Sequence, residues 1–191
     1  MKMMINKIIY FVKFRDVFNK INFLILLFPI FLISYIIIFQ GSLSYHEDII
    51  INSNIENVIE LHENTSLMKN YMDGFISYDV IKGKSRNTGS IAEITTIFNS
   101  NESVSRKIVI TEEVILSNLP NQKILIYNSG AVKNIITYRF IKMGDNKTIF
   151  FRSHEYEFNT YTKVSSFFMS NKIKRKSYAY LSNFKNYVEN Y

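Results

Sequence analysis

IIINSNIENVIELHENTSLMKNYMDGF, residues 49–75, changes from strand to helix and back within one short stretch. The segment Leu43–Ile51 (LSYHEDIII) that leads into it is predicted to be the first strand. Asn52-Ser53-Asn54 supplies helix caps, and a second short helix over Ser66–Met72 is predicted to stop at Asp73-Gly74. The apolar positions of the first helix recur at helical spacing: Ile55, Val58, Ile59 and Leu61 or His62.

The segments that follow alternate as strands do and are rich in Ile, Val, Thr, Tyr and Phe. Turn signals separate them, among them Gly83–Gly89 and the hairpin Gly144-Asp145-Asn146. The predicted strands are Phe75–Lys82, Ser90–Phe98, Lys107–Ser117, Lys123–Asn128, Val132–Met143 and Lys147–Phe158. Residues Tyr161–Asn190 then change to three- and four-residue spacing, which predicts a long helix. The order predicts an α+β domain with an antiparallel sheet of about seven strands.

This element order resembles the helix-grip superfamily known as SRPBCC or START-like, which includes polyketide cyclase-like, coenzyme Q-binding-like and birch-pollen-allergen-like proteins. The resemblance covers about residues 43–191, and the proline usual before the first helix is replaced here by Asn52-Ser53-Asn54. The matching stretches are Ile49–Phe75, Gly89–Phe98, Thr111–Leu116, Pro120–Tyr127, Ile136–Thr148 (ITYRFIKMGDNKT) and Leu181–Glu189 (LSNFKNYVE). The resemblance implies a curved sheet wrapped around the C-terminal helix, with an apolar cavity for lipids, polyketides, quinones or other hydrophobic ligands.

A different kind of segment precedes this domain. INFLILLFPIFLISYIIIF, residues 21–39, has no charged residue and is long enough to cross the hydrocarbon core. Residues 21–40 are therefore predicted to be a transmembrane helix acting as a signal anchor, with the bilayer as partner. Five basic residues precede the span and residues 40–60 contain none, which places the N-terminus in the cytoplasm and the domain on the other side. The alternative is a cleaved signal peptide, with a processing site near Ser42-Leu43-Ser44.

The charge distribution limits the classes of partner. The net charge of +7 sits at the two ends, because residues 1–20 carry +4 whereas residues 41–160 hold 12 basic and 14 acidic residues. Residues 1–20 suit a basic cytoplasmic or interfacial segment, and no nucleic-acid surface is predicted on the domain. The absence of cysteine excludes disulfides and thiolate catalysis. No metal cluster or cofactor motif occurs, so neither a metal nor a cofactor is expected.

The candidate site residues come from the aromatic strands and the long helix. On the strand Lys147–Phe158, Phe150, Arg152, His154, Tyr156 and Phe158 share one face, which points either into the domain or to solvent. Glu112 and Glu113 point to opposite faces of their strand, so one of them is expected inside. His46 and His62 are expected at the surface. The cavity candidates are Glu113, Tyr127, Tyr138, Arg152, His154, Tyr156, Phe167 and Phe168.

Three functions fit these observations. The first is a membrane-anchored binding or carrier module for a lipid or another hydrophobic small molecule. The second is a cyclase, dehydratase or hydrolase that uses the same cavity, with Arg152, His154, Glu113 or Tyr138 as acid or base. The third is a structural or partner-binding module whose cavity has collapsed onto its own aromatic side chains. Neither a protein partner nor a specific ligand is indicated.

Overall fold

The computed structural model describes residues 25, 27–36, 42–101 and 104–191, and the side chains of these residues other than 98–101 and 104–105. The chain divides into two compact units, Met1–Gly41 and Ser42–Tyr191. In the first unit, residues 27–36 are helical. No helix within the described residues is long and apolar enough to span a membrane. The predicted segment 1–20 and much of the predicted span 21–40 lie outside the described residues, so the anchor stays a prediction.

The second unit is built on a single antiparallel sheet of seven strands in the order β1-β7-β6-β5-β4-β3-β2. The first strand therefore pairs with the last, with Ser42 opposite Glu157 and Ile51 opposite Thr148. The strands are β1 (Ser42–Ile51), β2 (Phe75–Lys82), β3 (Ile91–Asn101), β4 (Val104–Asn118), β5 (Gln122–Asn128), β6 (Val132–Lys142) and β7 (Thr148–Phe158). The predicted α+β class and the antiparallel sheet are confirmed.

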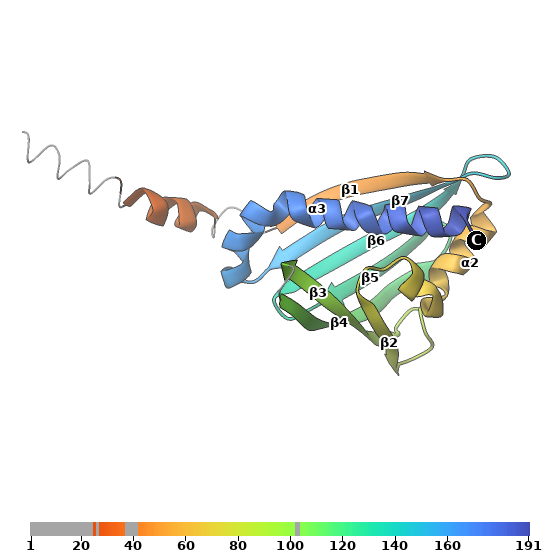
Figure 1. Cartoon of the computed structure of the whole chain (residues 1–191), viewed down its shortest axis with the longest axis horizontal. Coiled ribbons are helices and arrows are strands. Elements are labelled where there is room, and N and C mark those ends of the chain that lie inside the picture. Colours follow the sequence, from red (N-terminus) through yellow and green to blue (C-terminus); the bar gives the residue numbers. More distant parts are fainter. Residues whose placement is uncertain (1–24, 26, 37–41, 102–103) are drawn as a thin grey trace, which may run out of the picture. The chain divides into compact units, whose positions relative to one another are not determined.

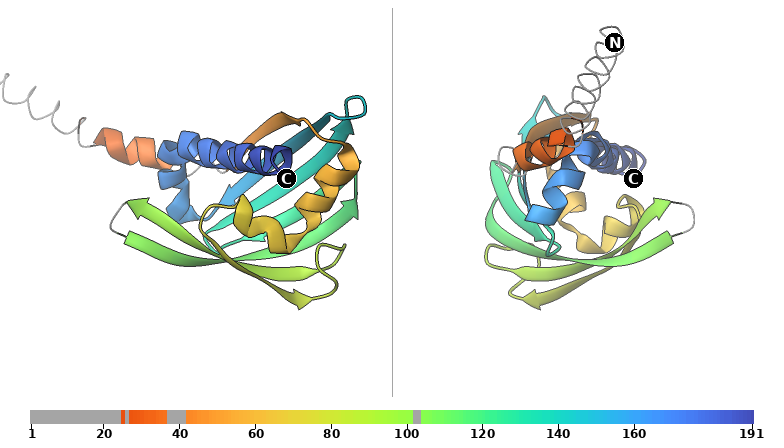
Figure 2. Two further views of the ribbon diagram at one scale, coloured as in Figure 1. Left: turned by 45° about the vertical axis from the view of Figure 1, so that its right-hand side comes forward. Right: turned by 90° about the vertical axis from the view of Figure 1, so that its left-hand side faces the viewer.

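Three helical segments accompany the sheet: α2 (Ile55–Glu63), the 3-10 helix η1 (Thr65–Asn70) and α3 (Thr160–Glu189). The sheet curves around α3, while α2 and η1 lie at one end of it (Figures 1 and 2). Asn54 caps α2 by accepting a hydrogen bond from the Asn57 backbone N–H, and Asn159 caps α3 through the Thr162 N–H. This is the helix-grip arrangement that the element order predicts.

The core fills the space between the α2 end of the sheet and the C-terminal half of α3. Val58 of α2, Phe150 of β7 and Phe184 of α3 are all fully buried there. The turn after η1 fits closely against β3, because a Cβ on Gly74 (φ +71°) would lie 2.4 Å from the Ile97 carbonyl oxygen. Only glycine fits this position without moving the backbone.

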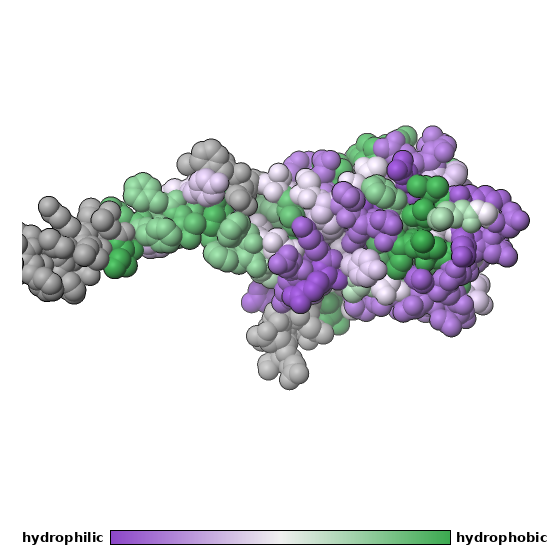
Figure 3. Space-filling view, turned by 90° about the horizontal axis from the view of Figure 1, so that it is seen from above, coloured by the Kyte–Doolittle hydropathy of each residue, from purple (hydrophilic) through white to green (hydrophobic). Residues whose placement is uncertain are grey.

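The apolar pattern of α3 is only partly a core pattern. Leu181, Phe184 and Val188 are buried, whereas Phe167 and Phe168 are 40% and 69% exposed. The face of the domain seen in Figure 3 is mostly hydrophilic, with separate hydrophobic patches. Helical spacing thus predicted that α3 is a helix, but the buried residues of α3 all lie in its C-terminal half.

Candidate ligand cavity

A cavity of about 430 Å³ lies between the inner face of the sheet, η1 and α3. This volume lies in the range of roughly 300–1,000 Å³ that is usual for small-molecule sites. The apolar part of its wall includes Ile94, Ile110, Leu125, Ile136 and Phe150. The polar part includes Tyr127, Tyr138, Arg152, Tyr156 and Tyr180. The third functional alternative, a collapsed cavity, therefore does not describe this domain.

Four of the predicted site residues line the cavity: Tyr127, Tyr138, Arg152 and Tyr156. The face of β7 that carries Arg152 points inward, since Phe150, Arg152 and His154 are all buried. Arg152 lies directly opposite Tyr138 of β6 in the antiparallel register. Of the two orientations that the sequence allowed for this face of β7, the structure shows the one that points into the domain.

Three other predictions place a residue wrongly in the cavity wall. Glu113 is exposed, and its neighbour Glu112 is the carboxylate that points inside, with no exposed surface. Phe167 and Phe168 are also exposed and contact each other at right angles, 5.2 Å between ring centroids. They belong to the first half of α3, which is not packed into the core.

His154 is buried behind the cavity wall in a polar network with Glu47 of β1. Its Nε2 lies 3.1 Å from Glu47 Oε1, and its Nδ1 lies 3.3 Å from Asn134 Nδ2. Ser177 of α3 donates a hydrogen bond of 2.5 Å to the same Glu47 oxygen. The contact with Glu47 assigns the proton to Nε2, because an ionised carboxylate can only accept a hydrogen bond. Burial lowers the pKa of His154, although the hydrogen bond that Nε2 donates to Glu47 opposes this shift, so the ring is neutral at pH 7.

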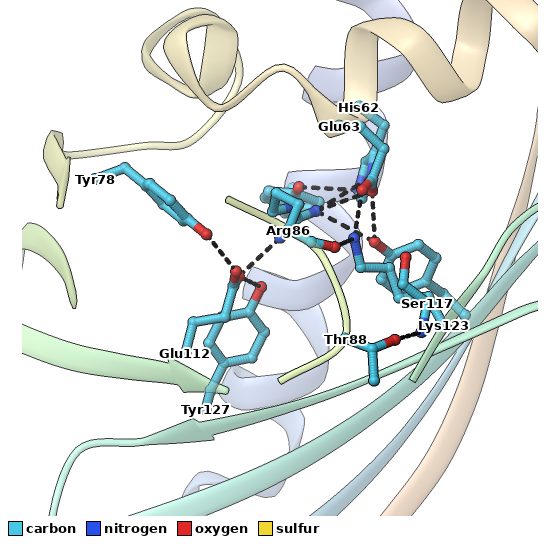
Figure 4. A network of polar contacts seen from close by, with 11 residues as sticks. His62, Glu63, Tyr78, Arg86, Thr88, Glu112, Ser117, Lys123 and Tyr127 are labelled. Atoms are coloured by element: carbon cyan, nitrogen blue, oxygen red, sulfur yellow. Dashed lines mark hydrogen bonds and ion pairs between the residues drawn. The ribbon is translucent and has the colours of Figure 1, made fainter. Parts of the chain in front are cut away.

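A second polar network is centred on Arg86, which the β2–β3 loop carries into the domain (Figure 4). Arg86 Nη1 donates to Glu112 Oε2 at 2.7 Å. Tyr127 donates to the same oxygen and Tyr78 to Glu112 Oε1, each at 2.7 Å. Glu112 thereby has one cation and two hydroxyl donors, which suits an ionised carboxylate that is removed from water.

The other side of this network is formed by Glu63 at the end of α2. Its carboxylate contacts Lys123 Nζ and accepts a 2.8 Å hydrogen bond from Tyr138. Burial alone would raise the pKa of Glu63, but the hydrogen bond to His62 and the positive charge of Arg86 lower it well below its usual range. Burial and the neighbouring Arg86 lower the pKa of Lys123 to about 8. Lys123 still carries its charge at pH 7.

His62 is buried, which corrects the prediction that it lies at the surface. Its ring meets Tyr138, Phe140, Phe150 and Phe184 edge to face at 4.9–5.6 Å. Nδ1 lies 3.3 Å from Glu63 Oε1 and Nε2 lies 3.4 Å from the Tyr180 hydroxyl. Burial lowers the pKa of His62 to about 4, so the ring is neutral at pH 7. His46 is exposed, as predicted.

Several residues of the two networks were not among the predicted site residues. Strand alternation carried a signal for Lys123, which shares the inward face of β5 with Leu125. Helical spacing in α2 likewise indicated that His62 is buried, because it follows the buried Val58 by four residues. Arg86 left no such signal, because it lies in a loop between Gly83 and Gly89. Within the described residues, no group of three potential metal ligands occurs.

The comparisons with known proteins give similarity of structure without similarity of sequence. No family model and no curated protein matches the sequence. The structure of Ara h 8.0201 has a TM-score of 0.61 at 8% identity, covering 79% of this chain and 100% of that one. Zhui aromatase/cyclase from Streptomyces sp. R1128 has a TM-score of 0.60 at 9% identity, covering 78% and 94%.

A third similar structure is norcoclaurine synthase from Thalictrum flavum in complex with dopamine and hydroxybenzaldehyde. Its TM-score is 0.53 at 15% identity, and the match covers 77% of this chain and 86% of that one. Identities this low establish a common architecture and leave the ligand and the reaction open. Residues 42–191 therefore form a helix-grip domain, with the fold of Ara h 8.0201, Zhui aromatase/cyclase and norcoclaurine synthase.

Proposed function

We propose that this chain is a membrane-anchored binding or carrier protein for a lipid or another hydrophobic small molecule. The observation that carries the proposal is the 430 Å³ cavity, whose wall is largely apolar and aromatic. Apolar surface in such a cavity favours a ligand that is poorly soluble in water. Norcoclaurine synthase, which has the same fold, is known in complex with two aromatic molecules, dopamine and hydroxybenzaldehyde.

The proposed anchor would bring the cavity close to the bilayer. Residues 21–39 end only two residues before β1, and Ser42 at the start of β1 pairs with Glu157 of β7. The cavity residues Val132 and Tyr156 belong to this same end of the sheet, because Val132 pairs with Phe158. A ligand would thus exchange with the leaflet over a short path. The domain would lie on the non-cytoplasmic side.

The anchor predicts that the full chain stays with the membrane under alkaline extraction, and that deletion of residues 2–40 releases the domain. The measurement is fractionation of the full and shortened chains, with the intact mass of the membrane form. A mature N-terminus near residue 44 would instead establish a cleaved signal peptide.

Filling the cavity is expected to prevent binding. Ile110→Trp places a large ring in the cavity wall, whereas Val109→Trp on the same strand adds the same ring to the exposed face. Mass spectrometry of organic extracts from the full-length protein measures the retained molecule. We expect a loss of at least about tenfold in the Ile110→Trp protein and none with Val109→Trp. Extracts with no molecule above background in the unsubstituted protein, or equal retention by both variants, would contradict the proposal.

A second candidate function is an enzyme of the cyclase, dehydratase or hydrolase type. The observation in its favour is that Tyr138 and Arg152, two of the predicted acid or base groups, face each other across β6 and β7 in the cavity wall. The Tyr138 hydroxyl is engaged with Glu63 at 2.8 Å, and burial raises its pKa, which favours binding over proton transfer. Incubation with the retained molecule distinguishes the two, because a carrier returns it with unchanged mass and unchanged chromatographic retention, whereas dehydration or hydrolysis changes the mass and cyclisation changes the retention.

A further inference from the structure

Three exposed aromatic side chains, Tyr161, Phe167 and Phe168, form an aromatic patch on the first half of α3. Phe167 and Phe168 are 40% and 69% exposed, and Tyr161 in the first turn is 90% exposed. Rings of this size leave a large apolar area in contact with water. Exposed apolar surface that is gathered in one place is typical of a contact with a partner or a membrane.

The aromatic patch lies toward the end of the domain at which β1 begins. Ser177 of α3 donates a hydrogen bond to Glu47 of β1, and Lys174 Nζ lies 5.6 Å from the centre of the Tyr45 ring, two residues earlier on β1. Therefore α3 runs alongside β1 in the same direction. The residues of α3 before Lys174 extend toward Ser42, the first residue of β1.

The length of chain between the proposed anchor and β1 indicates what the aromatic patch contacts. Only Gln40 and Gly41 separate the apolar run 21–39 from Ser42. Since each trans peptide advances the chain by about 3.8 Å, Ser42 would lie within about 11 Å of the hydrocarbon core. The headgroup region on each side of that core is roughly 5–8 Å deep. The anchor would thus hold this end of the domain at the headgroups.

Basic residues follow the aromatic patch along the same helix. Lys172 and Arg175 are exposed, and α3 has no acidic residue before Glu189. The exposed carboxylates Glu155 and Glu157 belong to the outer face of β7, whereas α3 covers the inner face of the sheet (Figure 2). A helix with exposed rings and basic residues matches the bilayer interface, where the rings meet the acyl boundary and the positive charges meet anionic headgroups.

We propose that the first half of α3 is a second membrane contact of this protein. The aromatic patch enters the acyl boundary of the leaflet, and Lys172 and Arg175 contact the headgroups of anionic phospholipids. The inference goes beyond the proposed function, from which it takes the anchor, because it concerns a surface of the domain and not the content of the cavity. Ile173 of the same helix lines the cavity, so the contact would bring this part of the cavity wall near the leaflet.

The test places a fluorescent probe beside the aromatic patch. The chain has no cysteine, so Ser165→Cys at an exposed position of α3 accepts a single NBD label. The full-length protein is reconstituted in nanodiscs of phosphatidylcholine and phosphatidylglycerol, with and without bromine on the acyl chains. We expect quenching by the brominated lipid to be at least about threefold greater than for labelled Asp145→Cys. Asp145, whose side chain is 98% exposed, lies in the β6–β7 turn beside the other end of β1.

Substitutions in the Ser165→Cys protein identify the groups responsible. Phe168→Gln should reduce the quenching at least about twofold. Ile50→Gln is the matched control, because it removes an exposed apolar side chain at the other end of β1, and it should leave the quenching unchanged. Quenching should also increase with the fraction of phosphatidylglycerol, and Lys172→Gln combined with Arg175→Gln should abolish this increase.

Three results would overturn the second membrane contact. Equal quenching of the labels at Ser165→Cys and Asp145→Cys in incorporated protein, or quenching that none of these substitutions alters, would exclude it and leave the anchor and the cavity intact. A label that is insensitive to bromine, but whose emission changes with protein concentration in detergent, would assign the aromatic patch to a second copy of this chain. Failure of the full-length protein to enter nanodiscs would overturn the anchor and this contact together.

Discussion

Replacing Arg86 with methionine is expected to lower the free energy of unfolding by about 3–5 kcal/mol, although the residue lies in a loop. Arg86 is 6% exposed and supplies the only arginine contact that Glu112 makes within the described residues, at 2.7 Å. Glu112 itself has no exposed surface. Without the guanidinium, an ionised carboxylate would stay buried with two tyrosine hydroxyls as partners. The loss is large because the remaining charge keeps its full desolvation cost.

The backbone of the loop supports this interpretation. Arg86 has φ +63°, a conformation that costs a residue with a side chain about 1–3 kcal/mol. The loop is held against β4 by the hydrogen bond from Gly89 N–H to the Val114 carbonyl at 2.7 Å and from Ser117 N–H to Thr88 Oγ1 at 2.9 Å. The contacts of the buried guanidinium offset the backbone strain.

Denaturant unfolding of the full-length protein in detergent measures the effect, with a double-mutant cycle to identify its cause. Arg86→Met combined with Glu112→Gln should be more stable than the sum of the single effects predicts, because the double variant buries no unpaired charge. Lys133→Met, which breaks the exposed pair with Glu157, is the control and should cost less than about 1 kcal/mol. Strict additivity of Arg86→Met and Glu112→Gln would show that the pair is not what stabilises the loop.

The fold was predictable because its determinants are local. Alternating apolar residues define each strand, and Asn54 and Asn159 lie where the helices begin. The antiparallel order follows from short turns such as the one at Gly144, which join consecutive strands. The pairing of β1 with β7 joins the two ends of the domain, which lie far apart in the sequence, so no local pattern predicts it.

The site residues were predictable only where the alternation of side chains along a strand determines which face they occupy. Once Phe150 faces the core, Arg152 must face the cavity, and Tyr138 opposite it follows. The choice between Glu112 and Glu113 has no local basis, because both faces of β4 carry apolar residues: Val114 is buried and Ile115 is exposed. The burial of Arg86 could not be predicted at all, because it depends on the left-handed backbone conformation of Arg86 within a loop flanked by glycines. Nonlocal charge pairing, which no spacing encodes, determines this part of the site.

The stability of the domain is expected to fall as the pH decreases from 7 to 5, and His62 is the group responsible for the largest single part in this range. Burial lowers its pKa from 6.5 to about 4, so the unfolded chain binds a proton in this range that the folded domain excludes. Its contribution is complete above pH 6.5 and is lost as the pH falls towards 4. The shift corresponds to about 3 kcal/mol in total.

The groups that face His62 determine the direction of this effect. Glu63 at 3.3 Å favours the charged ring, whereas Arg86 opposes it, and the four aromatic rings around His62 exclude water. Tyr180 offers a hydroxyl to Nε2 at 3.4 Å. Desolvation outweighs the attraction to Glu63, which is why the folded domain keeps the ring neutral.

Unfolding free energies of the full-length protein between pH 7 and pH 5 measure the effect, and His62→Gln isolates it. Glutamine keeps a polar side chain at this position but does not titrate, so the variant should lose less stability over this range, by about 2 kcal/mol at pH 5. His46→Gln removes an exposed histidine and should follow the unsubstituted protein. The remaining slope in His62→Gln would come from His154, whose pKa is also lowered by burial. If the His62→Gln and unsubstituted profiles are parallel between pH 7 and pH 5, His62 is not excluded from protonation in the folded domain.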